Sequence, residues 1–363
     1  MKLALIGDIA LFGKMSLDEN PHIKNNLSEV AAFLGGFDYV VGNMETPFSL
    51  KKKAKGAKSA YLCSDIQNVE IIKYLGINAV SLANNHMFDY GHEGYETTKN
   101  VLTETGIDFF GAEGKELYLE LNGNRFAFSG FCCYSTNPLQ CVNCGEYGVN
   151  AYDMKIVKDV IERNHRNGFM NIVAVHAGIE HVNYPSIDHI RAARLLAGVC
   201  PYIYYGHHPH VVQGVEIYKE SLIAHSLGNF CFDDVYNDIS NMPLVSLSEN
   251  NRMGMILDLT IEQNQIIDWK EQLIYIQEDG MIKLIDDKET LLDYNRHLEN
   301  CEKNVDDYIV LRERILRERI SERKKYRDFR WYLSRLRPRY VRLLWDIHQN
   351  AKLYIKSVKA QIS

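Results

Sequence analysis

Short runs of Val, Ile, Leu, Tyr and Phe recur along the first 250 residues, and each run stops at a glycine or a polar residue. Runs of this length are typical of strands, and the stretches that follow them have the apolar spacing of helices. Strands are expected at residues 2–6, 39–41, 79–82, 126–131, 172–175, 202–205 and 222–224, and helices at residues 28–34, 69–74, 95–105, 154–164 and 187–197. Strands that alternate with helices predict an α/β fold.

The pattern changes after residue 250. Residues 253–262 and 266–276 are two strand-like runs joined by the short turn 263–265, which predicts a β-hairpin that closes the sheet. From about residue 291 the chain is strongly charged with helical spacing. We therefore expect a main domain over residues 1–280 and a basic helical C-terminal extension over residues 290–363.

Composition is that of a globular protein, with 46% hydrophobic and 24% charged residues in 363. The formal net charge of −6 conceals an uneven distribution, because residues 301–363 carry 17 Lys and Arg against 8 Asp and Glu. The N-terminal apolar run is too short for a signal peptide, and no run approaches the roughly 20 apolar residues of a membrane span. Eight cysteines form no regular framework. These features predict a cytoplasmic protein.

Side chains that can bind a metal follow nearly every expected strand. They are Asp8, then Asn43 and Glu45, then Asn84, Asn85 and His86, then His176, then His207, His208 and His210, and finally Asn229. Strand ends converge in layered α/β folds, so these groups are expected in one crevice. Singly, Asp8 could cap a turn, His176 could be a core histidine, and residues 207–210 could be a plain turn. Together they favour a metal site, and their mixed N and O donors suit Mn, Fe or Zn better than Mg or Ca.

Six stretches, in this order over about residues 1–240, resemble the motifs of a known family: GDIAL, GNMETP, SLANNHMFDYG, VHAGIE, GHHPHVVQGVEIY and HSLGNFCFD. The family is the CapA type of bacterial capsule and poly-gamma-glutamate biosynthesis proteins, a branch of the calcineurin-like metallophosphoesterase superfamily. The resemblance implies a four-layer α-β-β-α sandwich with the site at one edge.

The resemblance also implies roles for individual residues. Asp8, Glu45 and Asn85 match metal ligands, as do His176 and His210, and the remaining imidazole is His207 or His208. His86 matches a catalytic histidine, which Asp89 would orient. Substrate-contacting or supporting positions are expected at Asn43, Asn84, Glu180, Gln213 and Asn229. Ala10 stands where dinuclear phosphoesterases have a histidine, so one or two divalent ions are expected.

The function implied is metal-dependent hydrolysis of a phosphoester or polymer precursor in capsule, poly-gamma-glutamate or envelope polysaccharide biosynthesis. A bound metal lowers the pKa of water from 15.7 to about 7, and His86 would protonate the leaving group. The alternative is a non-catalytic metal-binding component of an envelope-polymer synthesis or export complex. The expected partners are an anionic polymer or phosphorylated glycan precursor and other envelope-biosynthesis proteins.

Residues 323–359 combine basic and aromatic positions, including Trp331, Tyr332 and Trp345. Three interpretations remain open. The segment could pack on the acidic body as a helical appendage, or lie as an amphipathic helix on the anionic inner face of the membrane. Nucleic acid is the least favoured partner, because no recognised nucleic-acid-binding motif is present.

Overall fold

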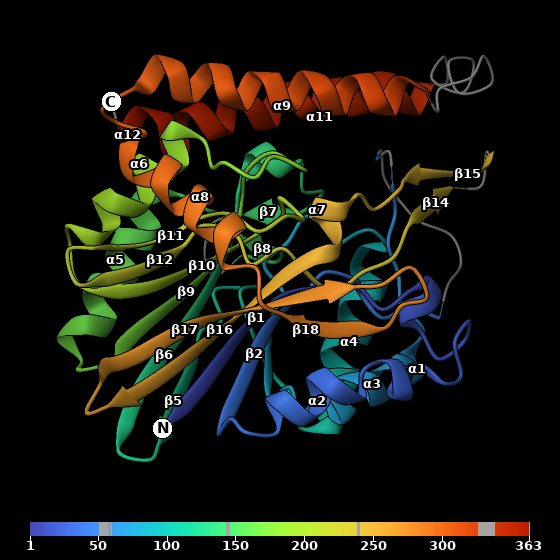
Figure 1. Ribbon diagram of the computed structural model, residues 1–363, viewed down its shortest axis with the longest axis horizontal. Coiled ribbons are helices and arrows are strands. Elements are labelled where there is room, and N and C mark those ends of the chain that lie inside the picture. Colours follow the sequence, from blue (N-terminus) through green and yellow to red (C-terminus); the bar gives the residue numbers. More distant parts are fainter. Residues whose placement is uncertain (51–57, 59, 143–145, 238–239, 326–337, 363) are drawn as a thin grey trace.

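Strand β1 (Lys2–Ile9) is buried on both faces, since Leu3 and Leu5 alternate with Ala4 and Ile6 and all four are inaccessible to solvent. Such a strand needs a packing layer on each side of its sheet. The computed structural model supplies both layers (Figure 1) and describes residues 1–362 except 51–57, 59, 143–145, 238–239 and 326–337.

The first sheet has a parallel centre and an antiparallel flank. Its path runs β18 (Ile282–Ile285), β17 (Gln265–Ile276), β16 (Met253–Glu262), β1, β2 (Tyr39–Met44), β3 (Ala79–Ser81) and β4 (Asp108–Phe110), and β13 (Asn229–Cys231) also pairs with β1. Strands β1 to β4 are mutually parallel, whereas β16, β17 and β18 form an antiparallel meander.

The second sheet faces the first. Its strands, in spatial order, are β11 (Val215–Tyr218), β12 (Ser221–Ala224), β10 (Tyr202–His207), β9 (Met170–His176), β6 (Asn124–Cys132) and β5 (Leu117–Leu121). Apolar side chains of both sheets meet in one core, where Leu5 and Val41 lie with Phe128 and Ile203. Two further sheets of two strands lie outside the sandwich: β7 (Cys141–Val142) pairs in parallel with β8 (Val149–Asn150), and β14 (Val235–Asn237) pairs antiparallel with β15 (Ser240–Val245).

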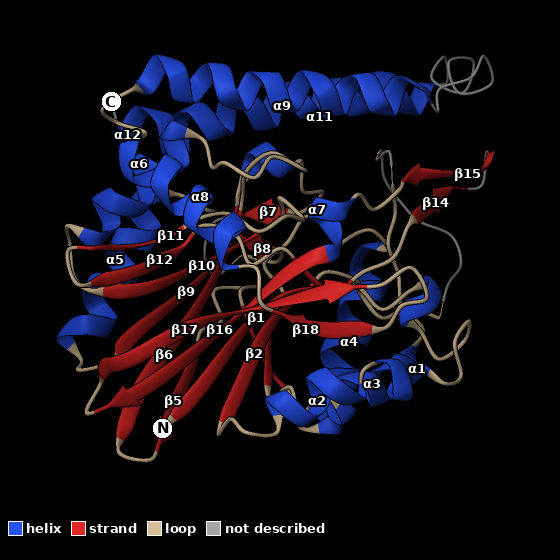
Figure 2. Cartoon of the chain, in the orientation of Figure 1, coloured by secondary structure: helices blue, strands red, loops and turns tan. Residues whose placement is uncertain are grey.

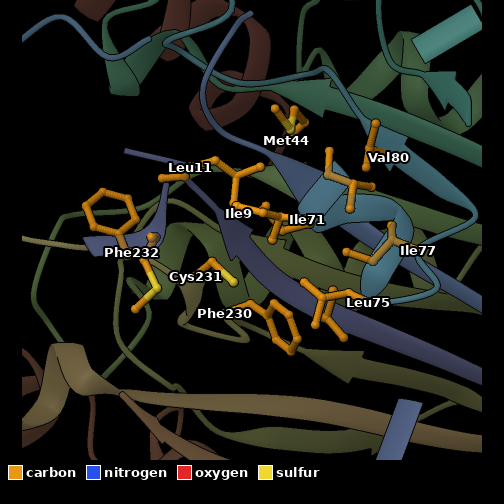
Figure 3. Packing of buried hydrophobic residues seen from close by; sticks show 14 of the residues in the cluster. Ile9, Leu11, Met44, Ile71, Leu75, Ile77, Val80, Phe230, Cys231 and Phe232 are labelled. Atoms are coloured by element: carbon orange, nitrogen blue, oxygen red, sulfur yellow. The ribbon is translucent and has the colours of Figure 1, made fainter. Parts of the chain in front are cut away.

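Helices cover the outer face of each sheet (Figure 2). The first sheet is covered by α1 (Ile23–Asn26), α2 (Ser28–Leu34), α3 (Val69–Tyr74) and α4 (Gly91–Thr105), and the second by α5 (Met154–Arg166) and α6 (Ile187–Ala197). Figure 3 shows one such interface, with Ile71 of α3 packed near Ile9 and Val80. The predicted four-layer α-β-β-α sandwich is confirmed.

The C-terminal helices also pack on the sandwich. They are α8 (Lys288–Asn300), α9 (Val305–Lys325), α11 (Pro338–Tyr354), a π-helical turn η4 (Ile355–Lys359) and α12 (Ala360–Ile362). Leu291, Tyr294 and Leu298 of α8 join the core between the sheets, and Val358 joins the core under α5 and α6. In Figure 1, helices α9 and α11 both run across the same edge of the sandwich.

Most predicted elements are confirmed, and helices 28–34, 69–74 and 187–197 match to the residue. The hairpin is confirmed too, and Gln263 and Asn264 at its turn both have the positive φ of a type I′ turn. The expectation that this hairpin closes the sheet is wrong, because β18 adds a further strand beyond β17. The apolar periodicity of the sequence did not predict this four-residue strand.

The basic tail places apolar side chains in solvent. Val341, Leu344 and Trp345 of α11 are 71%, 68% and 62% exposed, so they do not fill an interface with the body. Trp331 and Tyr332 lie outside the described residues. Among the helices that the structure describes, none combines the length and hydropathy of a membrane span.

The buried His189 on α6 should make the free energy of unfolding depend on pH. Burial, aided by the charge of Arg312, lowers the pKa of His189 to about 4. A histidine whose pKa is lowered on folding contributes stability above its unfolded pKa of about 6.5, and this contribution is lost as the pH falls toward 4. We expect His189 to account for a loss of about 2 kcal/mol in unfolding free energy between pH 7.5 and 5. Chemical unfolding at both pH values should show a smaller loss for His189→Gln than for wild type.

The matched control is His165→Gln, on the exposed face of α5, which should keep the wild-type pH dependence. An equal loss of stability in wild type and His189→Gln would contradict the assignment to His189.

Candidate metal centre and active site

The register of the parallel strands brings the expected ligands together. Pairing places Asp8 of β1 beside Asn43 of β2 and Asn229 of β13, and His207 of β10 beside His176 of β9. Strands β1 and β2 run three residues past their predicted ends, β10 two and β9 one, because pairing continues into the polar positions. The parallel strands of both sheets therefore end at one edge of the sandwich, where their polar side chains lie together.

Gly206 permits this convergence at β10. A Cβ atom at this position would lie 1.8 Å from the carbonyl oxygen of His225, so only glycine lets β10 approach the chain that follows β12 so closely. In the motif GHHPH, the glycine is therefore required for packing, and the histidines that follow it are the candidate ligands.

One group of polar side chains surrounds Asp8, which is fully buried. Nδ1 of His207 lies 3.2 Å from Oδ1 of Asp8, and Nδ1 of His210 lies 3.2 Å from Oδ2. Burial alone would raise the pKa of Asp8, but these two imidazoles outweigh burial and hold the pKa well below its usual value. Burial opposes the charged form of His210 as well, yet Asp8 raises its pKa to about 9. Nδ1 of His210 also lies 3.0 Å from Oδ1 of Asn229.

A second group converges on Nε2 of His176. Oδ1 of Asn85 lies 2.9 Å from this atom, Nδ1 of His208 lies 3.1 Å away and Oε1 of Glu45 lies 3.7 Å away. Burial lowers the pKa of His208 to about 3 and, together with His208, lowers that of His176 well below its usual value. Both imidazoles are thus neutral at pH 7, which is the form that binds a metal.

Asn43 connects the two groups. Its Nδ2 donates to Oδ1 of Asp8 at 2.8 Å and to Oε2 of Glu45 at 2.7 Å. Ligand atoms of Asp8, Glu45 and His176 lie within 4.8 Å of one another, and all three side chains are buried. Asp8 and Glu45 therefore lie close enough to share one divalent ion or to hold neighbouring ones.

Unpartnered buried atoms show that this cluster fits a cation. Oε1 of Glu45 and Nε2 of His207 are buried without a hydrogen-bond partner among the described residues. Burial, followed by the charge of Asp8, raises the pKa of Glu45 well above its usual value. Two buried carboxylates with a free oxygen and a free imidazole nitrogen are costly without a cation. The donor set fits a divalent ion of the borderline class.

The loop after β10 is held in an unusual conformation. His208 and His210 have φ values of +92° and +55°, a region that costs non-glycine residues of order 1–3 kcal/mol each. Two hydrogen bonds hold the loop: His181 N donates to Pro209 O at 2.7 Å, and Asn251 Nδ2 donates to His210 O at 2.8 Å. Sequence reasoning missed Asn251, because an asparagine within the polar stretch 248–252 carries no local signal.

His86 and Asp89 form the expected pair next to the cluster. Nδ1 of His86 lies 2.6 Å from Oδ2 of Asp89, whose other oxygen accepts from Nζ of Lys58 at 2.8 Å. Lys58 Nζ also donates to the carbonyl oxygen of Asn85 at 2.6 Å. Burial, followed by the charge of Lys58, lowers the pKa of His86. Lys58 is buried and was missed, because the run KKKAKGAK is typical of a solvated surface.

The remaining expected residues have differing surroundings. Asn84 is a positioning residue: its Oδ1 accepts from His86 N and its Nδ2 donates to Oδ1 of Asn43 at 3.3 Å. Glu180 is partly exposed and lies 3.5 Å from Nε2 of His181. Gln213 Nε2 donates to Val182 O at 2.7 Å, so its described side-chain contact is with the backbone and not with a ligand atom.

Comparisons with known proteins identify the family to which this chain is related. Residues 2–234 match the family model "Bacterial capsule synthesis protein PGA_cap". "Capsule biosynthesis protein CapA" of Bacillus anthracis is 31% identical over 242 residues, covering 63% of this chain and 59% of that protein. "PGA biosynthesis protein CapA" of Bacillus subtilis strain 168 is 31% identical over 216 residues, covering 57% of each chain. This chain thus spans less than two thirds of either relative's length.

Among solved structures, the NAD nucleotidase of Haemophilus influenzae aligns with a TM-score of 0.41 and 10% identity, covering 90% of this chain and 60% of that one. The family model matches well over half of the chain and includes every motif of the cluster. The chain belongs to the bacterial capsule synthesis protein PGA_cap family.

Proposed function

We propose that this protein is a metal-dependent hydrolase that acts on a phosphoester or polymer precursor in capsule or envelope-polymer biosynthesis. The observation that carries the proposal is the buried cluster of Asp8, Glu45 and His176, with an unpartnered Glu45 oxygen, beside the His86–Asp89 pair. The names of the two Bacillus relatives support the biosynthetic context.

The ligands would be Asp8, Glu45, Asn85, His176 and His210, together with His207, His208 or both. A divalent ion there supplies Lewis acidity and makes a water molecule acidic enough to be deprotonated near neutral pH. The protein positions its groups in advance, because Asn43 fixes both carboxylates and Asn229 orients His210.

His86 is placed to move a proton. A carboxylate only accepts, so the 2.6 Å contact with Asp89 favours a proton on Nδ1, and Nε2 would be the atom that accepts or returns a proton. The lowered pKa of His86 keeps the ring neutral at pH 7. His86 would therefore take up a proton at Nε2 before delivering it to a leaving group.

The experiment is metal analysis followed by a substrate panel. Protein purified without chelator should contain about one or two equivalents of Mn, Fe or Zn by elemental mass spectrometry. Phosphomonoesters, phosphodiesters and phosphorylated glycans would then be assayed with Mn²⁺, and EDTA should abolish the hydrolysis. Metal without hydrolysis would favour a non-catalytic component of an envelope-polymer complex. Folded protein that neither contains nor takes up metal would contradict the metal-dependent function.

A further inference from the structure

Helix α9 of the C-terminal extension crosses the edge of the sandwich that holds the cluster. Near its start, Tyr308 Oη donates to Pro185 O at 2.9 Å, and Arg312 Nε donates to Tyr184 O at 2.9 Å. Two turns later, Arg319 Nη2 donates to Ser248 Oγ at 2.7 Å. The helix is therefore attached both to the segment that follows β9 and to the one that precedes α7 (Glu249–Arg252).

A cavity of about 260 Å³ lies between this helix and the cluster. The sandwich contributes Glu180, His181 and His208 to its lining, and α9 contributes Leu316, Arg319 and Ile320. His208 belongs to the group around His176, from which it is 3.1 Å distant. The cavity therefore leads from the candidate metal ligands to a face of α9.

Among the described residues of α9 that line this cavity, Arg319 carries a positive charge. Its side chain is 19% exposed, whereas that of Arg317, two residues earlier on the same helix, is 79% exposed. Ser248 takes one N–H of Arg319, and Glu322, at 3.1 Å, takes another. The guanidinium has five N–H donors in a planar fork that matches phosphate and carboxylate oxygens, and its contacts with described residues leave three of them for a ligand.

The cavity is also lined by Glu180, whose side chain is 39% exposed and whose Oε2 lies 3.5 Å from Nε2 of His181. Because Glu180 is partly exposed to solvent, screening reduces the repulsion between its carboxylate and a bound anion. Arg319 is more deeply buried, so its attraction for an anion is screened less.

We propose that α9 forms one wall of the substrate site and that Arg319 binds an anionic oxygen group of the substrate, a phosphate or a carboxylate, beside the metal cluster. The proposal rests on the proposed function for its substrate. It adds a binding residue from a segment beyond the matched residues 2–234.

The test is calorimetric titration of inorganic phosphate, and separately of glutarate, into the full chain loaded with Mn²⁺. Arg319→Met should weaken binding of at least one anion about tenfold or more, and the anion affected identifies phosphate or carboxylate. Arg319→Lys should retain part of the affinity, because it keeps the charge but loses the planar fork. Arg317→Met is the matched control and should bind as wild type does. Metal content should be equal in all four proteins.

Wild-type affinity for both anions in Arg319→Met would overturn the proposal, as would wild-type protein that binds neither. Failure of the proposed function would give a different set of results from failure of the Arg319 proposal. Protein that binds metal and phosphate but hydrolyses no ester would contradict the hydrolase and leave the Arg319 comparison intact. Hydrolysis with an unchanged KM in Arg319→Met would contradict only the role of Arg319.

Discussion

Asp8→Asn is expected to lower metal affinity by more than about 100-fold and to abolish hydrolysis. Loss of a residue that only supports a ligand typically costs 10–100-fold in affinity, and loss of a buried ligand carboxylate should cost more. Asparagine keeps the shape of the side chain and can still accept from Asn43, so the change removes charge and little packing. Metal content by elemental mass spectrometry and turnover on the best ester of the panel measure both effects.

Asp8→Asn should also lower the stability of the metal-free protein. His210 has a pKa of about 9 because Asp8 lies beside it, so this imidazolium contributes stability below pH 6.5 and loses it as the pH rises toward 9. Without the Asp8 carboxylate, a buried charge loses its partner, which typically costs 3–5 kcal/mol unless the ring becomes neutral. Chemical unfolding in EDTA at pH 6 should therefore show a clear loss of stability.

Asp258→Asn is the matched control for Asp8→Asn. Asp258 lies on the neighbouring strand β16 opposite Ala4, where its carboxylate is 3.5 Å from Lys2, away from the cluster. This variant should keep the metal and the activity. Metal content in Asp8→Asn equal to that of wild type would contradict the assignment of Asp8 as a ligand.

His86→Ala is expected to retain the metal and to lower kcat by about 10²- to 10⁴-fold, the range for removal of a general acid–base group. The described contacts of its ring are with Asp89 and Lys58, not with the carboxylates of the cluster. We therefore expect His86 to act on the substrate rather than on the ion. Metal analysis and steady-state kinetics of the same preparation separate the two roles.

His210→Ala provides the contrast, since Nδ1 of His210 lies 3.2 Å from Asp8 within the cluster. It should lose metal and turnover together. Equal loss of metal in His86→Ala and His210→Ala would show that His86 holds the ion or its ligands, and would contradict the division of roles.

Much of the candidate site could be predicted because its residues follow strands. Asp8, Glu45, Asn85, His176 and His210 each lie at or just after a strand end, and the rule that parallel strands share an edge brings them together. The sequence left open whether His207 or His208 is the ligand, and the structure shows why. Both imidazoles lie in the cluster, one 3.2 Å from Asp8 and the other 3.1 Å from His176.

Other residues of the site carried no local signal. Lys58 lies in a lysine-rich stretch that is typical of solvent, yet it is buried against Asp89 across 31 residues of chain. Asn251 supports the loop of His210 from 41 residues away, and Arg319 reaches Ser248 from 71 residues away. Their environment depends on which segments pack together, and local periodicity does not contain that information.

The sequence by itself determined most strands and helices of the sandwich and the candidate ligands at their ends, because alternation of apolar and polar positions reflects burial within a single strand or helix. It also determined the turn of the hairpin, through backbone preferences of adjacent residues. Only the tertiary structure decided that β18 extends the first sheet, that Lys58 is buried beside His86, and that α9 covers the cluster. These features arise from contacts between distant segments, whose free energy depends on the packed arrangement as a whole.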